Sequence, residues 1–195
     1  MPKFSDSERQ EIQNKLLEEG QRLFLAHGLK KVTIDDITQA AHIAKASFYK
    51  FYEGKEYLYL DIVQNIQAYI FEQLEKLLCE NKELSNKERV KQVFAKMSEY
   101  MLQYPIIALI DSSTVELISR KVSKEHLAAF YEQTVDAVEV MQRHGITFTC
   151  ENEIVSYILE ALYRAWINMQ HQKPEVIEVA TQILLDGMIH QIVLE

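Results

Sequence analysis

Apolar residues recur at helical spacing along almost the whole chain, and few residues interrupt the pattern. Only five glycines and three prolines are spread over 195 residues, although both are frequent wherever a chain turns sharply. Glu, Gln, Lys, Leu and Ala, which favour helices, are abundant. The sequence therefore predicts an all-α protein, and we find no internal repeat or low-complexity segment in it.

About nine helices are predicted from this periodicity and its breaks. Gly28 ends the first helix, Thr33 and Asp36 form a capping box at the start of the second, and Gly145 and Pro174 mark two later boundaries. The predicted helices cover about 7–27, 33–41, 45–52, 55–79, 86–103, 105–120, 123–144, 152–171 and 175–193.

Cysteine content and the chain's start bear on where the protein works. Cys79 and Cys150 are too few and too far apart for a disulfide framework or a zinc site. The first ten residues lack the apolar run of a secretory signal, and no stretch approaches the ~20 apolar residues of a membrane span. We expect a cytoplasmic protein with no membrane association.

Motifs that carry catalysis are missing from the sequence. There is no glycine-rich phosphate loop, nucleophile elbow or paired metal-ligand motif. The six histidines are scattered, and none forms a spaced pair with a carboxylate base. We therefore predict no catalytic residue, no metal site and no cofactor, and an enzyme is disfavoured.

Charge is distributed unevenly along the chain. Residues 1–60 carry nine Lys and Arg against nine Asp and Glu, so the net charge of −8 lies entirely in residues 61–195. The amino-terminal third is therefore the only part that approaches a polyanion without strong repulsion.

Residues 45–52 form an amphipathic helix with two distinct faces. At about 100° per residue, Phe48, Phe51 and Tyr52 share one side. The other side carries small residues, hydroxyls and ammonium groups, which suit close approach to DNA and contact with phosphate oxygens. Its residues are Lys45, Ala46, Ser47, Tyr49 and Lys50.

A tight three-residue turn after Ala41 precedes this helix, which is the spacing of a helix-turn-helix motif. Such a motif inserts its second helix into the major groove of DNA. An amphipathic helix with exposed lysines also occurs in proteins that bind other proteins. A helical adaptor that binds protein through this unit is therefore the alternative function.

Residues 33–63, "TIDDITQAAHIAKASFYKFYEGKEYLYLDIV", resemble the DNA-binding segment of the TetR family of bacterial repressors. The resemblance implies a three-helix DNA-binding domain over 1–54 and a larger helical domain for ligand binding and dimerisation over 55–195. It implies that Thr33, Tyr49 and Lys55 contact the DNA backbone. It also implies that Lys45, Ala46, Ser47 and Lys50 face the groove, although His42 stands where the family usually has glycine.

The last two predicted helices are apolar over most of their circumference, so both sides of each should be buried. We expect them to pair with their copies in a homodimer that binds a palindromic operator in double-stranded DNA. An ordinary monomeric core explains the same pattern. The expected interface residues are Ile154, Ile158, Ala161, Leu162, Ala165, Ile183, Leu184, Gly187 and Met188.

Aromatic and methionine side chains gather in the middle and last helices. They are usually core residues, but Met adapts to ligands, and buried Tyr and Trp need polar partners. The TetR resemblance implies an inducer site in this region, so we expect a small, lipophilic inducer that releases the repressor from DNA. The expected pocket residues are Met97, Tyr100, Tyr104, Phe130, Tyr131, Tyr163 and Trp166.

Overall fold

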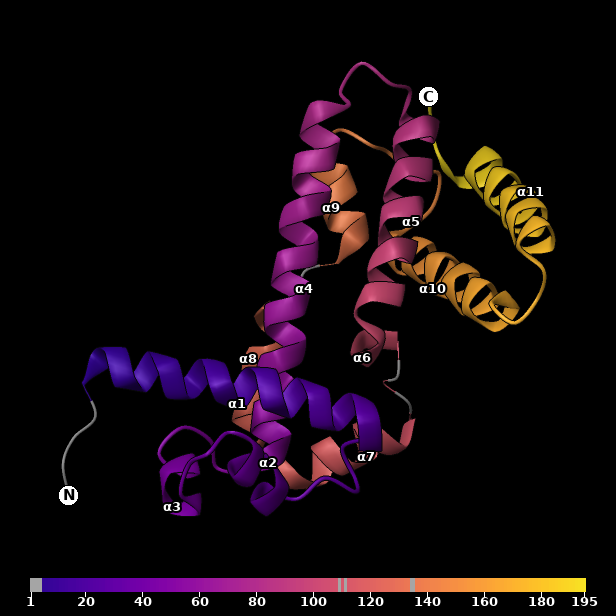
Figure 1. Ribbon diagram of the computed structural model, residues 1–195. Coiled ribbons are helices and arrows are strands. Elements are labelled where there is room, and N and C mark those ends of the chain that lie inside the picture. The colour runs from indigo at the N-terminus through magenta and orange to yellow at the C-terminus, as the bar shows by residue number, and fades with distance from the viewer. Residues whose placement is uncertain (1–4, 109, 111, 134–135) are drawn as a thin grey trace. The chain divides into compact units, whose positions relative to one another are not determined.

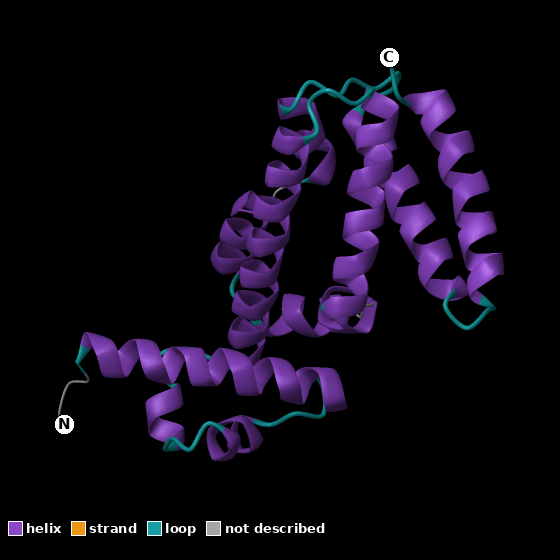
Figure 2. Ribbon diagram, turned by 45° about the horizontal axis from the view of Figure 1, so that its top comes forward, coloured by secondary structure: helices purple, strands orange, loops and turns teal. Residues whose placement is uncertain are grey.

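Helices make up most of the part of the chain that its computed structural model describes, residues 5–108, 110, 112–133 and 136–195 (Figure 1). Short loops join the helices, and Figure 2 draws no strand among these residues. The helices are α1 (Asp6–His27), α2 (Ile34–Ala40), α3 (Lys45–Phe48), α4 (Lys55–Glu80), α5 (Asn86–Gln103), α6 (Pro105–Ala108), α7 (Ser112–Lys121), α8 (Lys124–Gln133), α9 (Ala137–Arg143), α10 (Asn152–Met169) and α11 (Pro174–Ile192).

The all-α prediction and its count of about nine helices are confirmed. The predicted helix 105–120 corresponds to α6 and α7, and residues 109 and 111 lie outside the described part of the chain. The predicted helix 123–144 corresponds to α8 and α9. Asp136 caps the start of α9 by accepting a 2.7 Å hydrogen bond from the Val138 backbone N–H, which accounts for a new helix there.

The helix predicted over 45–52 is shorter than expected, because α3 ends at Phe48. Beyond it the backbone tightens into bonds between residues three apart, from Lys50 N–H to Ser47 and from Phe51 N–H to Phe48. Such bonds commonly close the last turn of a helix. The side chains of residues 45–52 still point to the two sides that helical spacing predicted.

Packing divides the chain into two compact units, Met1–Gln67 with Gln103–Thr134, and Ala68–Leu102 with Val135–Glu195. The first unit contains the helix-turn-helix segment together with α6, α7, α8 and the first half of α4. The second contains the rest of α4 with α5, α9, α10 and α11. The domain boundary predicted at residues 54 and 55 stays a prediction.

Close approach of α1 and α4 holds the first unit together. Gly20 on α1 faces α4, where an added Cβ would lie 2.9 Å from Leu58 and 3.1 Å from Ile62. The rings of Phe24 and Tyr59 meet edge to face nearby, with centroids 5.4 Å apart. A methyl group at position 20 would push against the Leu58 side chain, so glycine allows the two helices to approach closely.

In the second unit α10 and α11 form an antiparallel pair, drawn in orange and yellow in Figure 1. The end of the chain is held by an antiparallel bridge between Phe148 and Val193. Lys87 at the start of α5 pairs with Glu195, with 2.5 Å between nitrogen and oxygen. These contacts hold the end of the chain after α11 against the loop before α10 and the start of α5.

Candidate functional site

The predicted capping box positions α2 at the start of the helix-turn-helix segment. The Thr33 hydroxyl accepts a 3.1 Å hydrogen bond from the Asp36 backbone N–H, and the Asp36 carboxylate accepts a 2.8 Å bond from the Thr33 backbone N–H. The Thr33 hydroxyl also donates to that carboxylate at 2.7 Å. Hydrogen bonding from Thr33 holds the pKa of Asp36 below its usual range. The prediction of this cap is confirmed.

His42 makes the turn between α2 and α3. Its φ is +55°, in the left-handed region that favours glycine. The Ile43 backbone N–H then donates to the Thr38 carbonyl at 3.0 Å, which closes the turn. The TetR family usually has glycine at this position, and the positive φ of the backbone explains that preference.

The inner face of residues 45–52 fastens this segment to the first unit. Phe48 is fully buried, and Tyr52 is buried beside it with ring centroids 5.9 Å apart. The Tyr52 hydroxyl donates to Asp61 of α4 at 2.5 Å. Burial, and then this bond, raise the pKa of Tyr52 above its ordinary value. Phe51 is half-buried, with the Arg9 guanidinium 5.0 Å from its ring centroid.

The outer face of the same residues is open to solvent. Tyr49 is 53% exposed although its neighbour Phe48 is fully buried. Lys45, Ala46 and Lys50 are exposed and Ser47 is half-buried. The predicted division between an inner aromatic face and an outer polar face is therefore correct.

Asp35 of α2 places a negative charge beside this exposed face. The Lys45 ammonium lies 2.9 Å from the carboxylate of Asp35 on α2, and both side chains are exposed. Hydrogen bonding to Asp35, then its charge, raises the pKa of Lys45. The negative charge of Asp35 therefore competes with any phosphate that approaches Lys45.

Lys55 begins α4, but its ammonium points back into the loop between α1 and α2. It donates to the carbonyls of Leu29 at 2.8 Å, Lys30 at 3.3 Å and Val32 at 2.5 Å. Burial lowers the pKa of Lys55 from its ordinary value. Three acceptors use all three protons of the ammonium, so Lys55 ties the start of α4 to the loop before α2.

A mainly apolar pocket of about 240 Å³ lies in the first unit. One wall is α4, and the others come from α7, α8 and Ile110. Val115 and Tyr131 are exposed and lie at its mouth, whereas Val63 and Ile118 are buried. Its lining residues are Tyr59, Leu60, Val63, Gln67, Ile110, Val115, Ile118, Leu127, Phe130 and Tyr131.

Two of the seven predicted pocket residues, Phe130 and Tyr131, line this cavity. Met97, Tyr100, Tyr163 and Trp166 belong to the second unit, and Tyr104 to the first. Tyr163 stacks on Phe94 with ring centroids 4.5 Å apart, and burial raises the pKa of its phenol. The α4 residues of the pocket were not predicted from the sequence. The sequence does show a pattern there, because Tyr59, Val63 and Gln67 recur at spacings of four and therefore lie on one side of the helix.

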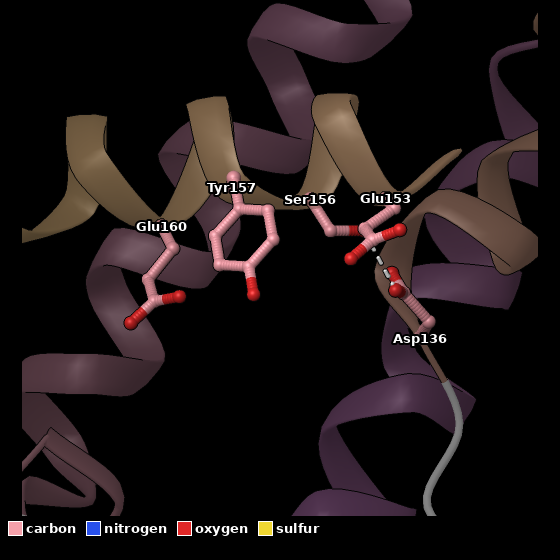
Figure 3. Close-up of a pocket in the computed structure, with 5 residues that line it drawn as sticks. All are labelled: Asp136, Glu153, Ser156, Tyr157 and Glu160. Atoms are coloured by element: carbon pink, nitrogen blue, oxygen red, sulfur yellow. Dashed lines mark hydrogen bonds between the residues drawn. The ribbon is translucent and has the colours of Figure 1, made fainter. Parts of the chain in front are cut away.

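An acidic groove lies in the second unit beside the first turns of α10 (Figure 3). Glu153, Tyr157 and Glu160 project from α10 toward it, and the Ser156 hydroxyl donates to Asp136 at 2.7 Å. Three carboxylates give the groove the same sign of charge as DNA. This surface is therefore unsuited to a nucleic acid.

Much of the expected dimer surface is uncovered within the single chain. Ile183 is 67% exposed, and Ile154, Ala161, Leu184 and Gly187 are exposed as well. Ile158, Ala165 and Met188 are half-buried, whereas Leu162 is buried inside the unit. A Cβ at Gly187 would meet nothing within 4 Å. A run of exposed apolar side chains on two adjacent helices is typical of a protein interface.

A helix-turn-helix segment with a polar outer face, carried on an all-helical chain, is typical of a DNA-binding regulator. Residues 16–62 match the model of a family described as "Bacterial regulatory proteins, tetR family". No curated protein sequence matches the chain.

Solved structures of TetR-family regulators share the fold over most of their length. A TetR/AcrR-family regulator from Thermobifida fusca has a TM-score of 0.64 at 19% identity, covering 90% of this chain and 97% of its own. A regulator from Streptomyces coelicolor has a TM-score of 0.60 at 14% identity, covering 92% and 98%. The fatty acid degradation regulator FadR from Bacillus halodurans has a TM-score of 0.59 at 14% identity, covering 94% and 97%.

Residues 16–62 belong to the TetR family of bacterial regulatory proteins, and the chain shares its fold with regulators of that family. Members of this family are DNA-binding proteins that control transcription and are generally not enzymes. Among the described helices, none is long and apolar enough to cross a membrane. The described residues also contain no cluster of His, Cys, Asp and Glu that could hold a metal ion.

Proposed function

We propose that this protein is a homodimeric, sequence-specific repressor that leaves a palindromic operator when a small, lipophilic inducer binds. The observation that carries the proposal is the two-faced segment 45–52. Phe48 and Tyr52 are buried in the first unit, whereas Tyr49 and Lys50 are exposed on the opposite side. A protein that works on bacterial DNA would act in the cytoplasm.

In this proposal residues 1–54 read the DNA, and residues 55–195 bind the inducer and dimerise. Thr33 and Tyr49 contact the DNA backbone, and Lys45, Ala46, Ser47 and Lys50 face the major groove. Lys55 acts on the backbone through the start of α4, which its ammonium holds against the loop before α2.

Dimerisation supplies the affinity that one short recognition helix lacks. Two helices held about 34 Å apart read two successive major grooves on one side of the duplex. The exposed apolar surface of α10 and α11, including Ile154, Ile183 and Leu184, supports this pairing. Ile158, Ala161, Ala165, Gly187 and Met188 complete the proposed interface, and Leu162, which is buried within the single chain, packs beneath it.

The pocket of the first unit is the inducer site that the packing favours, and Phe130 and Tyr131 belong to it. The remaining residues expected from the sequence, Met97, Tyr100, Tyr104, Tyr163 and Trp166, stay a prediction. The apolar lining supports a lipophilic inducer. FadR, which shares the fold, is a regulator of fatty acid degradation, so fatty acyl derivatives are one class to test.

Release from DNA follows from linkage between the two binding sites. An inducer that binds better to a conformation whose recognition helices no longer match successive grooves weakens DNA binding. A difference of about 1–3 kcal/mol between the two conformations changes DNA affinity about 5–150-fold.

Selection of bound sequences from random DNA, followed by titration of the selected site with salt, tests the proposal. We expect a palindrome whose half-sites are centred about 10 base pairs or a multiple apart, and an affinity that falls steeply with salt. A helical adaptor that binds protein through residues 1–54 would select no palindrome. That result, with no salt-dependent DNA binding, would reject the regulator.

A further inference from the structure

We infer that the pocket of the first unit selects a compact, uncharged lipophile and excludes carboxylates and other ions. The inference rests on the proposed function, since it names the chemical class of the inducer. Its basis is the lining of the pocket, which belongs entirely to one compact unit.

No charged side chain lines this pocket among the described residues. Seven of its ten lining residues are Leu, Ile, Val or Phe, and the polar groups are two phenols and one amide. The amide belongs to Gln67, on the same stripe of α4 as Tyr59 and Val63. Amides and phenols bond to neutral hydroxyl or carbonyl groups without changing the net charge of the site.

The lining disfavours an ion for an electrostatic reason. A carboxylate that leaves water loses its hydration, and only a paired cation or several strong donors restore that loss. Lys30 and Arg120 line a different cavity of the first unit, between the α1–α2 loop and α7. An alcohol of the same chain length loses much less on burial, because one hydrogen bond satisfies it.

Volume limits the size of the ligand. At about 240 Å³ the pocket is smaller than the roughly 300–1,000 Å³ typical of sites for drug-sized molecules. A medium-length alcohol or a small aromatic compound suits such a volume. A long acyl chain with a large polar carrier exceeds it.

Packing connects this pocket directly to the DNA-binding helices. Tyr59 lines the pocket and also meets Phe24 of α1 edge to face. Its neighbours Leu58 and Ile62 lie against Gly20 of the same helix. Because tightly packed interiors transmit displacement, a ligand that moves the α4 wall acts on α1 without an intermediate element.

Three test ligands with eight-carbon chains, 1-octanol, octanoate and octylammonium, isolate the effect of charge. Isothermal titration of the full chain at pH 7 measures each affinity directly. We expect 1-octanol to bind at least tenfold more tightly than either ion. Equal or tighter binding of octanoate or octylammonium overturns the inference, as does failure of all three to bind.

A substitution at the mouth of the pocket tests where the alcohol binds. Val115 is partly exposed, so Val115→Trp narrows the entrance with little strain and should lower 1-octanol affinity at least tenfold. Ser119→Trp places the same side chain at an exposed position one turn along α7 and serves as the matched control. Unchanged binding in Val115→Trp would place the alcohol elsewhere and overturn the inference.

A third experiment tests whether a cation added to the pocket allows it to bind a carboxylate. Gln67→Arg supplies the missing cation and should raise octanoate affinity at least tenfold, whereas Gln67→Met should not. Unchanged octanoate binding in Gln67→Arg counts against the electrostatic explanation. Operator binding is measured separately, without ligand. If the protein binds the operator but no alcohol, the inferred ligand class is wrong while the proposed DNA-binding function stands.

Discussion

Phe24 of α1 and Tyr59 of α4 meet edge to face with ring centroids 5.4 Å apart, and both side chains are almost fully buried. Phe24 belongs to the helix that supports the DNA-binding segment, and Tyr59 lines the apolar pocket. One aromatic contact is therefore shared by the core of the DNA-binding helices and the wall of the proposed inducer site.

Tyr59→Ala should lower the free energy of unfolding by about 3–4 kcal/mol, because it removes a buried ring and leaves a cavity. Urea unfolding followed by far-UV circular dichroism measures the change. Trp166 fluorescence is less suitable, since that residue belongs to the second unit. Tyr49→Ala is the matched control, because its ring is 53% exposed and packs only edge to face on Phe48. Tyr49→Ala should lower the free energy of unfolding by no more than about 1.5 kcal/mol but weaken binding to every DNA sequence.

Asp35→Asn should strengthen DNA binding about fivefold at low salt. The substitution releases Lys45 from its 2.9 Å ion pair and removes a negative charge near the phosphates. A unit charge about 4 Å away in water contributes about 1 kcal/mol. Fluorescence anisotropy with labelled operator measures the gain, which should shrink as salt rises.

Glu11→Gln is the control for Asp35→Asn. It also separates an exposed carboxylate from its lysine, Lys15, but both of these residues belong to α1 and neither belongs to the helix-turn-helix segment. An equal gain in both variants would mean that only net charge matters, and would remove Asp35 from the DNA-facing surface.

Local features of the DNA-binding segment were predictable from sequence because they depend on neighbouring residues. The Thr33–Asp36 cap and the burial of Phe48 beside exposed Tyr49 follow from spacing alone. The pocket was not predictable in the same way. Its lining brings α4 together with α7 and α8, about 50 to 70 residues further along the chain. Helical periodicity identifies an apolar face but not the helix that covers it.

The hydrogen-bond partners of the Lys55 ammonium were also not predictable from the sequence. The TetR resemblance implied that Lys55 contacts the DNA backbone. Its three carbonyl acceptors come from residues 29–32, which sequence spacing does not bring near residue 55. Only the fold reveals these partners.

Lys55→Met should lower the free energy of unfolding by about 1–3 kcal/mol, because it removes charge-assisted hydrogen bonds and leaves the loop carbonyls without this donor. DNA affinity should fall as the loop before α2 loosens. The slope of log K against log salt should stay the same, since the ammonium binds carbonyls. A slope reduced by about 0.9 would instead place the ammonium on a phosphate.

Ile183→Glu should convert the proposed dimer to a monomer at micromolar concentration. The side chain is 67% exposed in the single chain, so the substitution spares the fold but introduces a charge into an apolar interface. Sedimentation velocity measures the association state. Leu102→Glu, at another exposed apolar position of the second unit, should remain dimeric. A dimeric Ile183→Glu variant would exclude this face from the interface.

His42→Gly should stabilise the protein by about 0.5–1 kcal/mol. A non-glycine residue in the left-handed region carries about 1–2 kcal/mol of strain, part of which the greater entropy of unfolded glycine offsets. His42→Val should destabilise it, because a branched side chain tolerates a φ of +55° least. Urea midpoints of the three proteins should rank Gly above His above Val. The reverse order would mean that the His42 side chain stabilises the turn by more than its backbone strains it.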